Sequence, residues 1–154
     1  MQILGINYHA EVKSLSRPLS VQTKKGDVMG ELIKLLVIED DASLCELLGE
    51  LFSGEGYQYK ILEDANQLFY WVDEFKPDVI LLDYLLPSTN GGELCAQLKS
   101  NVGTKGIPVI LYSAISEQLL PLNEYKCDSF VAKPFDINHL IYTIEKYTHR
   151  SHAA

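Results

Sequence analysis

The chain has 154 residues, of which 47% are hydrophobic and 22% charged, and its formal net charge is −8. This is the size and balance of one globular domain, and no apolar run approaches the roughly 20 residues that a membrane-spanning helix needs. Residues 1–31 carry four basic and three acidic side chains, so the acidic excess lies in the rest of the chain. That excess argues against a sequence-independent nucleic-acid surface, and its simplest role is solubility.

Residues 1–31 contain several Ser, Pro and Gly residues without regular apolar spacing, which is typical of a flexible extension or linker. They do not begin with a basic stretch and an apolar block, so no secretory signal is indicated. The three cysteines (Cys45, Cys95 and Cys127) form neither a zinc-binding pattern nor a disulfide framework. We expect them to be buried, reduced residues of a cytoplasmic protein.

After the extension, strand-like apolar runs alternate with helical spacing. The first run, residues 34–38, predicts a strand that leads directly into an acidic triplet. A helix follows, capped by Asp41 or Ser43, and two closely spaced glycines end it. Residues 57–62 then predict a second, more amphipathic strand.

The next helix is expected to begin at Asp64, because apolar residues recur at helical spacing beyond it. Residues 79–82 are four apolar residues in a row, bounded by Pro77 and Pro87. This pattern is typical of a strand buried on both faces of a parallel sheet. Asp83 directly follows the run, where a carboxylate is costly to bury unless it is paired or belongs to a site.

Gly91 and Gly92 are expected to break the chain before a third helix at residues 93–99. Residues 107–112 predict the fourth strand. A proline near its start is tolerable, because the missing backbone donor then falls at the strand entrance.

The fourth helix is expected to be short or irregular. Its segment, residues 116–125, contains Pro121, which removes a backbone donor and clashes in a helix interior. Residues 129–132 predict the fifth strand, and Asp136 is expected to start a closing amphipathic helix through Tyr147. Strands alternating with helices predict an α/β fold with a parallel sheet covered on both faces.

Polar residues follow four of the predicted strands: Glu39 and Asp40 the first, Asp83 the third, Ser113 the fourth and Lys133 the fifth. Parallel strands bring their carboxyl ends to one edge, so these side chains are expected to converge. Crowded carboxylates raise one another's pKa unless a cation lies among them, and Mg²⁺ suits few carboxylates with several waters. An aspartate so placed can form an acyl phosphate, with the lysine and serine contacting the phosphoryl oxygens.

Each of these residues alone has an ordinary explanation. An acid after a strand is often a helix cap or a solvated turn, a lone serine is often a turn residue, and a Lys-Pro pair is often an exposed turn. Their joint occurrence, in order at four strand ends, favours a functional site.

Four segments resemble those of the receiver domain of two-component response regulators, and the resemblance covers about residues 33–149. They are Leu35-Leu36-Val37-Ile38-Glu39-Asp40-Asp41, Asp78-Val79-Ile80-Leu81-Leu82-Asp83-Tyr84-Leu85-Leu86-Pro87 followed by Gly91, Val109-Ile110-Leu111-Tyr112-Ser113-Ala114, and Phe130-Val131-Ala132-Lys133-Pro134-Phe135.

The resemblance implies a flavodoxin-like, doubly wound sheet with strand order 2-1-3-4-5 in residues 32–150, with residues 151–154 as a tail. It implies that Asp83 accepts a phosphoryl group from a histidine kinase or a histidine phosphotransfer protein, with Lys133 and Ser113 as its contacts. The residues implied to hold Mg²⁺ are Glu39, Asp40, Asp83 and the backbone carbonyl of Leu85.

The resemblance also implies a switch. Small Ala114 would let Ser113 move inward, and Phe130 would turn inward behind it, changing the face formed by the fourth helix, fifth strand and fifth helix. Phe130 is equally interpretable as a fixed core aromatic. The implied protein is a signalling switch or phosphorelay intermediate that acts on a downstream protein. It is expected to catalyse only its own phosphorylation and dephosphorylation. It is not expected to bind nucleic acid or membrane directly, and it could form a dimer.

Two features depart from the family pattern. Ser113 and Lys133 are slightly closer in sequence than expected, and Pro121 lies between them, so we expect either that partners use a face other than the usual output face or that this segment is an adaptable surface. Leu85 and Ile115 are apolar at positions that flank the path of attacking water, so we expect a long phosphoryl lifetime. The chain resembles a stand-alone receiver or one excised from a larger protein.

Three other functions compete with this interpretation. An unphosphorylated interaction domain of the same fold is the main alternative. An aspartyl-phosphate hydrolase would usually have an acid where Leu85 stands. A flavin-binding domain would need a phosphate-cradling loop after the first strand, where the acidic triplet would repel phosphate.

Overall fold

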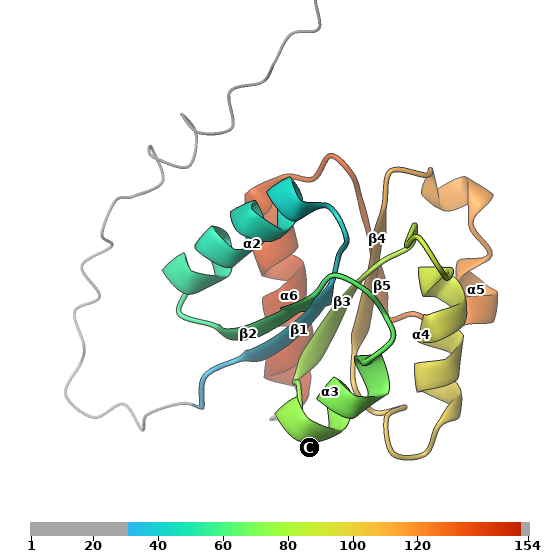
Figure 1. Cartoon of the computed structure of the whole chain (residues 1–154), viewed down its shortest axis with the longest axis horizontal. Helices are drawn as coiled ribbons and strands as arrows, with labels where there is room; N and C mark the ends of the chain where they lie inside the picture. The colour runs from blue at the N-terminus through green and yellow to red at the C-terminus, as the bar shows by residue number, and fades with distance from the viewer. Residues whose placement is uncertain (1–30, 152–154) are drawn as a thin grey trace, which may run out of the picture. The chain divides into compact units, whose positions relative to one another are not determined.

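The computed structural model describes residues 31–151, which form a parallel sheet between two layers of helices (Figure 1). The strands are β1 (Lys34–Ile38), β2 (Gln58–Leu62), β3 (Val79–Asp83), β4 (Val109–Ser113) and β5 (Ser129–Ala132). Neighbouring strands all pair in parallel, in the order β2-β1-β3-β4-β5. The predicted fold class and strand order are therefore confirmed. Residues 1–30 of the predicted extension and residues 152–154 of the predicted tail lie outside the described residues.

The helices cover both faces of the sheet. They are α2 (Ala42–Gly54), α3 (Leu68–Phe75), α4 (Gly91–Ser100), α5 (Leu122–Tyr125) and α6 (Ile137–Ser151), with a short 3₁₀ turn, η1 (Glu117–Leu119).

Because side chains alternate along a strand, each buried strand contributes to two hydrophobic clusters. Leu81 of β3 belongs to the cluster under α2 and α6, and its neighbour Leu82 belongs to the cluster under α3, α4 and α5. Every residue of β3 is buried, as predicted for a strand covered on both faces. Each fully buried aliphatic side chain of this kind contributes about 1.5–3 kcal/mol, so the two clusters fix the position of the strand.

Helix α2 starts and stops where its capping residues predict. Of the two capping candidates, Asp41 is the one used, because its Oδ1 accepts a hydrogen bond from the Leu44 amide at 2.8 Å. The helix ends at Gly54, and Gly56 adopts a left-handed backbone conformation with φ of 75°. Residue 57 precedes β2 rather than opening it.

The predicted start of α3 at Asp64 is wrong. The helix begins four residues later, at Leu68. The Asp64 carboxylate instead accepts a hydrogen bond from the Asn66 amide at 2.8 Å, which closes a tight turn. A side chain that bonds two residues onward stabilises a turn in competition with a helix, and that explains the difference.

The glycines at 91 and 92 do not precede α4 but form its first turn. Asn90 caps the helix by accepting a hydrogen bond from the Gly92 amide at 2.7 Å. A Cβ atom on Gly91 would lie 2.0 Å from the Asp83 carbonyl oxygen, and one on Gly92 would lie 2.2 Å from the Tyr125 ring. Close packing, rather than a break in the helix, therefore requires both glycines.

The fourth strand begins at Val109, two residues later than predicted, and runs to Ser113. Pro108 precedes it and still takes part in the pairing, because its carbonyl accepts a hydrogen bond from the Ile80 amide at 2.9 Å. The following segment is short and irregular, as predicted: η1 spans three residues and α5 four, with Pro121 at the position before α5.

Asp136 starts α6 as predicted, because its Oδ1 accepts a hydrogen bond from the His139 amide at 2.9 Å. All three cysteines are free thiols, but only Cys95 is fully buried, while Cys45 and Cys127 are half-buried. Within residues 31–151, every helix is too short or too polar to span a bilayer.

Candidate functional site

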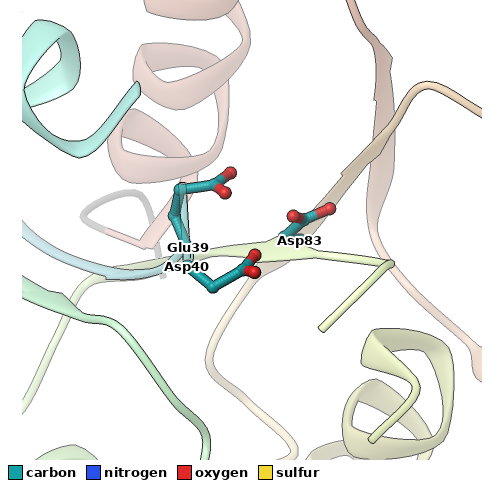
Figure 2. A group of neighbouring side chains, drawn as sticks. All are labelled: Glu39, Asp40 and Asp83. Carbon is teal, nitrogen blue, oxygen red and sulfur yellow. The ribbon is translucent and has the colours of Figure 1, made fainter. Parts of the chain in front are cut away.

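Three carboxylates meet at the carboxyl edge of the sheet. Glu39 and Asp40 directly follow β1, and Asp83 is the last residue of the adjacent strand β3. One oxygen from each of the three carboxylates lies within 4.8 Å of the other two (Figure 2). Glu39 and Asp83 are buried, whereas Asp40 is exposed and leaves the group open to solvent. The convergence predicted from the strand ends is therefore present for the acids.

Lys133 joins this group from the end of β5. Its Nζ lies 2.9 Å from Glu39 Oε2 and 3.2 Å from Asp83 Oδ2. The backbone holds it there, because the Lys133 amide donates to the Ser113 carbonyl at 2.8 Å and so extends the pairing of β4 with β5. Lys133 therefore shares in the predicted convergence and pairs with both Asp83 and Glu39.

The loop after Asp83 is held by its own hydrogen bonds. The Leu85 amide donates to Asp83 Oδ1 at 3.2 Å, and Leu85 forms an isolated antiparallel bridge with Asn90. Asn90 in turn donates from Nδ2 to the Tyr84 hydroxyl at 2.9 Å, and that hydroxyl lies 3.3 Å from the hydroxyl of Tyr125. The segment that carries Asp83 is thus connected to both α4 and α5.

Opposing effects act on the pKa of the Asp83 carboxyl group. Burial is the largest, and together with the Glu39 charge it raises the pKa of Asp83 to about 6, while Lys133 and the Leu85 amide act to lower it. A carboxylate with this pKa is still mostly ionised at neutral pH, yet it lies in surroundings that penalise its charge. An added cation would relieve that penalty.

Glu39 is only 1% exposed and is fully engaged. Its Oε1 accepts from the Asp41 amide at 2.9 Å, and its Oε2 accepts from Lys133 and from the Tyr112 hydroxyl, the latter at 2.5 Å. Three donors around one buried carboxylate fix its orientation and compensate for its loss of water.

Tyr112 is the site residue that the sequence does not reveal. In the sequence it continues the apolar run of β4 and indicates only a buried strand. One signal is available: a tyrosine in a strand buried on both faces needs a partner for its hydroxyl. The partner is Glu39, 73 residues away in sequence, and only the folded chain reveals it.

Among the described residues, the side chains of the other predicted residues make no hydrogen bond to Glu39, Asp40 or Asp83, although the Leu85 amide does. Ser113 is fully buried at the end of β4, and its hydroxyl accepts from the Ile115 amide at 3.0 Å. Ala114 follows it and is exposed. Phe130 in β5 is half-buried and packs on the cluster under α3, α4 and α5, an arrangement that fits a core aromatic as well as a switch. The Leu85 side chain is 55% exposed.

The donor set fits a hard divalent cation. Glu39, Asp40 and Asp83 offer oxygen atoms only, and oxygen is what Mg²⁺ and Ca²⁺ prefer. The three carboxylates and one nearby ammonium group leave an excess of negative charge, which a cation would balance. The exposed side of Asp40 leaves room for water, which Mg²⁺ retains when it binds to proteins.

Comparison with known proteins identifies the family. Residues 35–145 match the family model for the response regulator receiver domain. The chain therefore belongs to the response regulator receiver family, a part of two-component signal transduction, as the sequence predicted.

Relatives and solved structures agree with this assignment. The DNA-binding response regulator MtrA of Mycolicibacterium paratuberculosis is 34% identical over 111 residues, which are 70% of this chain and 48% of that protein. A putative response regulator from Chloroflexus aurantiacus has the same fold, with a TM-score of 0.71 at 23% identity over 77% of this chain and 99% of that one.

A second similar structure is the receiver domain of a sensor histidine kinase from Pseudomonas aeruginosa, with a TM-score of 0.69 at 18% identity over 77% of this chain and 98% of that one. It is described with a magnesium ion coordinated in its active site cleft. This chain spans about half the length of the curated relatives that it matches, so their whole-protein activities do not transfer directly.

Proposed function

We propose that the chain is a phosphoacceptor switch of a two-component system or phosphorelay, in which Asp83 receives a phosphoryl group. The observation that carries the proposal is the position of the Asp83 carboxylate, buried at a strand end between the Lys133 ammonium group and two further acids. Membership of the receiver family supports the same role.

In this proposal an Asp83 oxygen attacks the phosphorus atom of a phosphohistidine on a histidine kinase or histidine phosphotransfer protein. The phosphorus–nitrogen bond breaks as the new phosphorus–oxygen bond forms, and the partner's imidazole leaves with the electron pair and regains a proton. The Lys133 ammonium, already 3.2 Å from Asp83, stabilises the negative charge of the transferred group. Ser113 donates its hydroxyl to a phosphoryl oxygen after giving up its contact with the Ile115 amide.

Glu39, Asp40, Asp83 and the backbone carbonyl of Leu85 are the proposed ligands of Mg²⁺. When bound, Mg²⁺ would neutralise carboxylate charge and stabilise the phosphoryl oxygens. Asp40 is the most exposed of these acids and is placed to admit the ion. The raised pKa of Asp83 supports a cation-binding role, because its charge is not fully compensated by protein groups alone.

The output of the switch is proposed to be a change in the surface around α4, β5 and the short α5, passed on by Ser113, Ala114 and Phe130. New contacts of the phosphoryl group would shift a population between two conformations. The chain would then act on a downstream protein from the cytoplasm and catalyse only its own phosphorylation and dephosphorylation. The irregular η1–α5 segment is the part of this surface best suited to change shape.

The test is incubation with a small phosphodonor such as acetyl phosphate and MgCl₂, followed by intact mass measurement. We expect one added phosphoryl group on the wild type and none on Asp83→Asn. Asp73→Asn is a matched control, because Asp73 is exposed on α3 and its salt bridge to Lys76, which precedes the amino end of β3, includes none of the proposed site residues. An unmodified wild type would support an unphosphorylated interaction domain instead.

A further inference from the structure

Tyr112 lies beneath the proposed phosphorylation site and touches its charged groups. It is fully buried in β4 and is the register partner of Asp83 in the neighbouring strand β3. Its hydroxyl donates to Glu39 Oε2 at 2.5 Å. The same oxygen accepts from Lys133, so a neutral donor and a charged donor share one carboxylate oxygen.

The ring of Tyr112 also supports Lys133. The Lys133 ammonium nitrogen lies 4.3 Å from the ring centroid, a geometry that favours a cation over the aromatic face. The ring also meets Phe135 edge to face, with the centroids 6.4 Å apart. Packing therefore locks the ring in place, and the hydroxyl is held at the Glu39 carboxylate.

The proposed phosphoryl transfer places two demands on Lys133. It pairs with Glu39 before transfer, and it must turn to the phosphoryl oxygens afterwards. Glu39 is only 1% exposed, so a carboxylate oxygen that loses the lysine cannot find a replacement donor in bulk water. A second donor already in place removes this conflict, and Tyr112 is that donor.

We propose that Tyr112 is a positioning residue of this site: its hydroxyl holds the Glu39 carboxylate in place for Mg²⁺ and leaves Lys133 free to engage the phosphoryl group. This inference rests on the proposed function, because it assumes that the acids bind Mg²⁺. Groups that orient metal ligands in this way typically change metal affinity by about 10–100-fold when they are removed.

The first test is the variant Tyr112→Phe, which removes the hydroxyl and keeps the ring. We expect its affinity for Mg²⁺, measured by calorimetric titration of the unphosphorylated full chain, to fall by about tenfold. The matched control is Tyr57→Phe, which removes a hydroxyl that donates to Glu145 at the amino-terminal end of the sheet. Its affinity should equal that of the wild type.

A double-mutant cycle separates positioning from general packing. If Tyr112 acts through Glu39, then Tyr112→Phe should cause no further loss of Mg²⁺ affinity in a Glu39→Gln background. The same loss in both backgrounds would overturn the proposal. The rate of phosphorylation by acetyl phosphate at saturating MgCl₂ is a second readout. Tyr112→Phe should remain slower than the wild type under this condition, because Lys133 would stay bound to Glu39.

A further measurement does not depend on a variant folding. The Tyr112 hydroxyl proton, followed by NMR in the wild type, should remain protected from exchange when MgCl₂ and phosphodonor are added. Loss of that protection, or equal Mg²⁺ affinity of wild type and Tyr112→Phe, overturns the role of Tyr112 and leaves the proposed function standing. A wild type that neither binds Mg²⁺ nor takes up phosphate overturns the proposed function itself.

Discussion

Asp83 carries its charge in surroundings that disfavour it. Burial is the main cause and the Glu39 charge the second, and together they raise its pKa from 3.8 to about 6. The folded protein therefore holds the Asp83 proton more tightly than the unfolded chain does. The stabilisation that comes from this proton is complete below about pH 4 and is lost as the pH rises through 6.

Replacing this carboxylate by an amide should therefore stabilise the metal-free protein at alkaline pH. We expect Asp83→Asn to raise the free energy of unfolding by about 2 kcal/mol at pH 8, and to change it little at pH 4. Urea unfolding in the presence of a chelator measures both values. Asp73→Asn is the surface control. If Asp83→Asn were no more stable than the wild type at pH 8, that result would contradict a raised pKa of Asp83.

The residues beside Asp83 bear on how long a phosphoryl group would persist. The Leu85 amide contacts the Asp83 carboxylate, and the Leu85 side chain is apolar and exposed. Ile115, which follows Ser113 by two residues, is also apolar. Apolar side chains at the approach to an acyl phosphate exclude the water that would hydrolyse it.

Polar replacements at these two positions should shorten the lifetime of the phosphorylated protein. We expect Leu85→Asn combined with Ile115→Gln to speed the loss of phosphate by about tenfold, which corresponds to about 1.4 kcal/mol of barrier. The decay of the phosphorylated species by intact mass provides the measurement. Equal decay rates in the wild type and the double variant would refute the effect of these side chains on water.

At the scale of elements, the junction between β3 and α4 is the tightest constraint near the site. A Cβ atom on Gly91 would lie 2.0 Å from the Asp83 carbonyl oxygen and 2.8 Å from its carbonyl carbon. These are backbone atoms of a fully buried strand, so they cannot move aside as the end of a flexible side chain can. The start of α4 is thus pressed directly against the residue proposed to accept the phosphoryl group.

Gly91→Ala should therefore be strongly destabilising. We expect a loss of about 3 kcal/mol or more, because α4 must move away from the sheet to relieve the clash. Gly54→Ala is the matched control, since Gly54 lies in a helix and a Cβ atom added there would have no neighbour within 4 Å. That control should be neutral or slightly stabilising. Chemical unfolding compares the two, and equal stabilities would contradict the packing.

The sequence predicts elements well where one local pattern dominates. All five strands lie within two residues of their predicted bounds. The continuous apolar runs of β1, β3 and β4 have few alternative placements in a parallel sheet. The start of α3 is not predictable in this way, because the Asp64 side chain can cap either a helix or a turn, and local sequence does not decide between them. The role of Gly91 is equally hidden, because its constraint comes from Asp83, which only tertiary packing brings near.

At the scale of the whole molecule, the site exists only because strands distant in sequence end side by side. The convergence of Glu39, Asp40, Asp83 and Lys133 was predictable, because a parallel sheet places all its carboxyl ends at one edge. The role of Tyr112 was not predictable. It depends on the strand register that pairs Tyr112 with Asp83 and on the fold that brings its hydroxyl to Glu39.

The most direct test of the central claim is to locate the phosphoryl group chemically. The wild type is treated with acetyl phosphate and MgCl₂, trapped with hydroxylamine, which converts an acyl phosphate to a hydroxamate, and then digested for peptide sequencing by mass spectrometry. We predict a hydroxamate at residue 83 that forms only when Mg²⁺ is present. Modification at a different residue, or equal modification with Mg²⁺ removed by a chelator, would contradict a metal-dependent acceptor at Asp83.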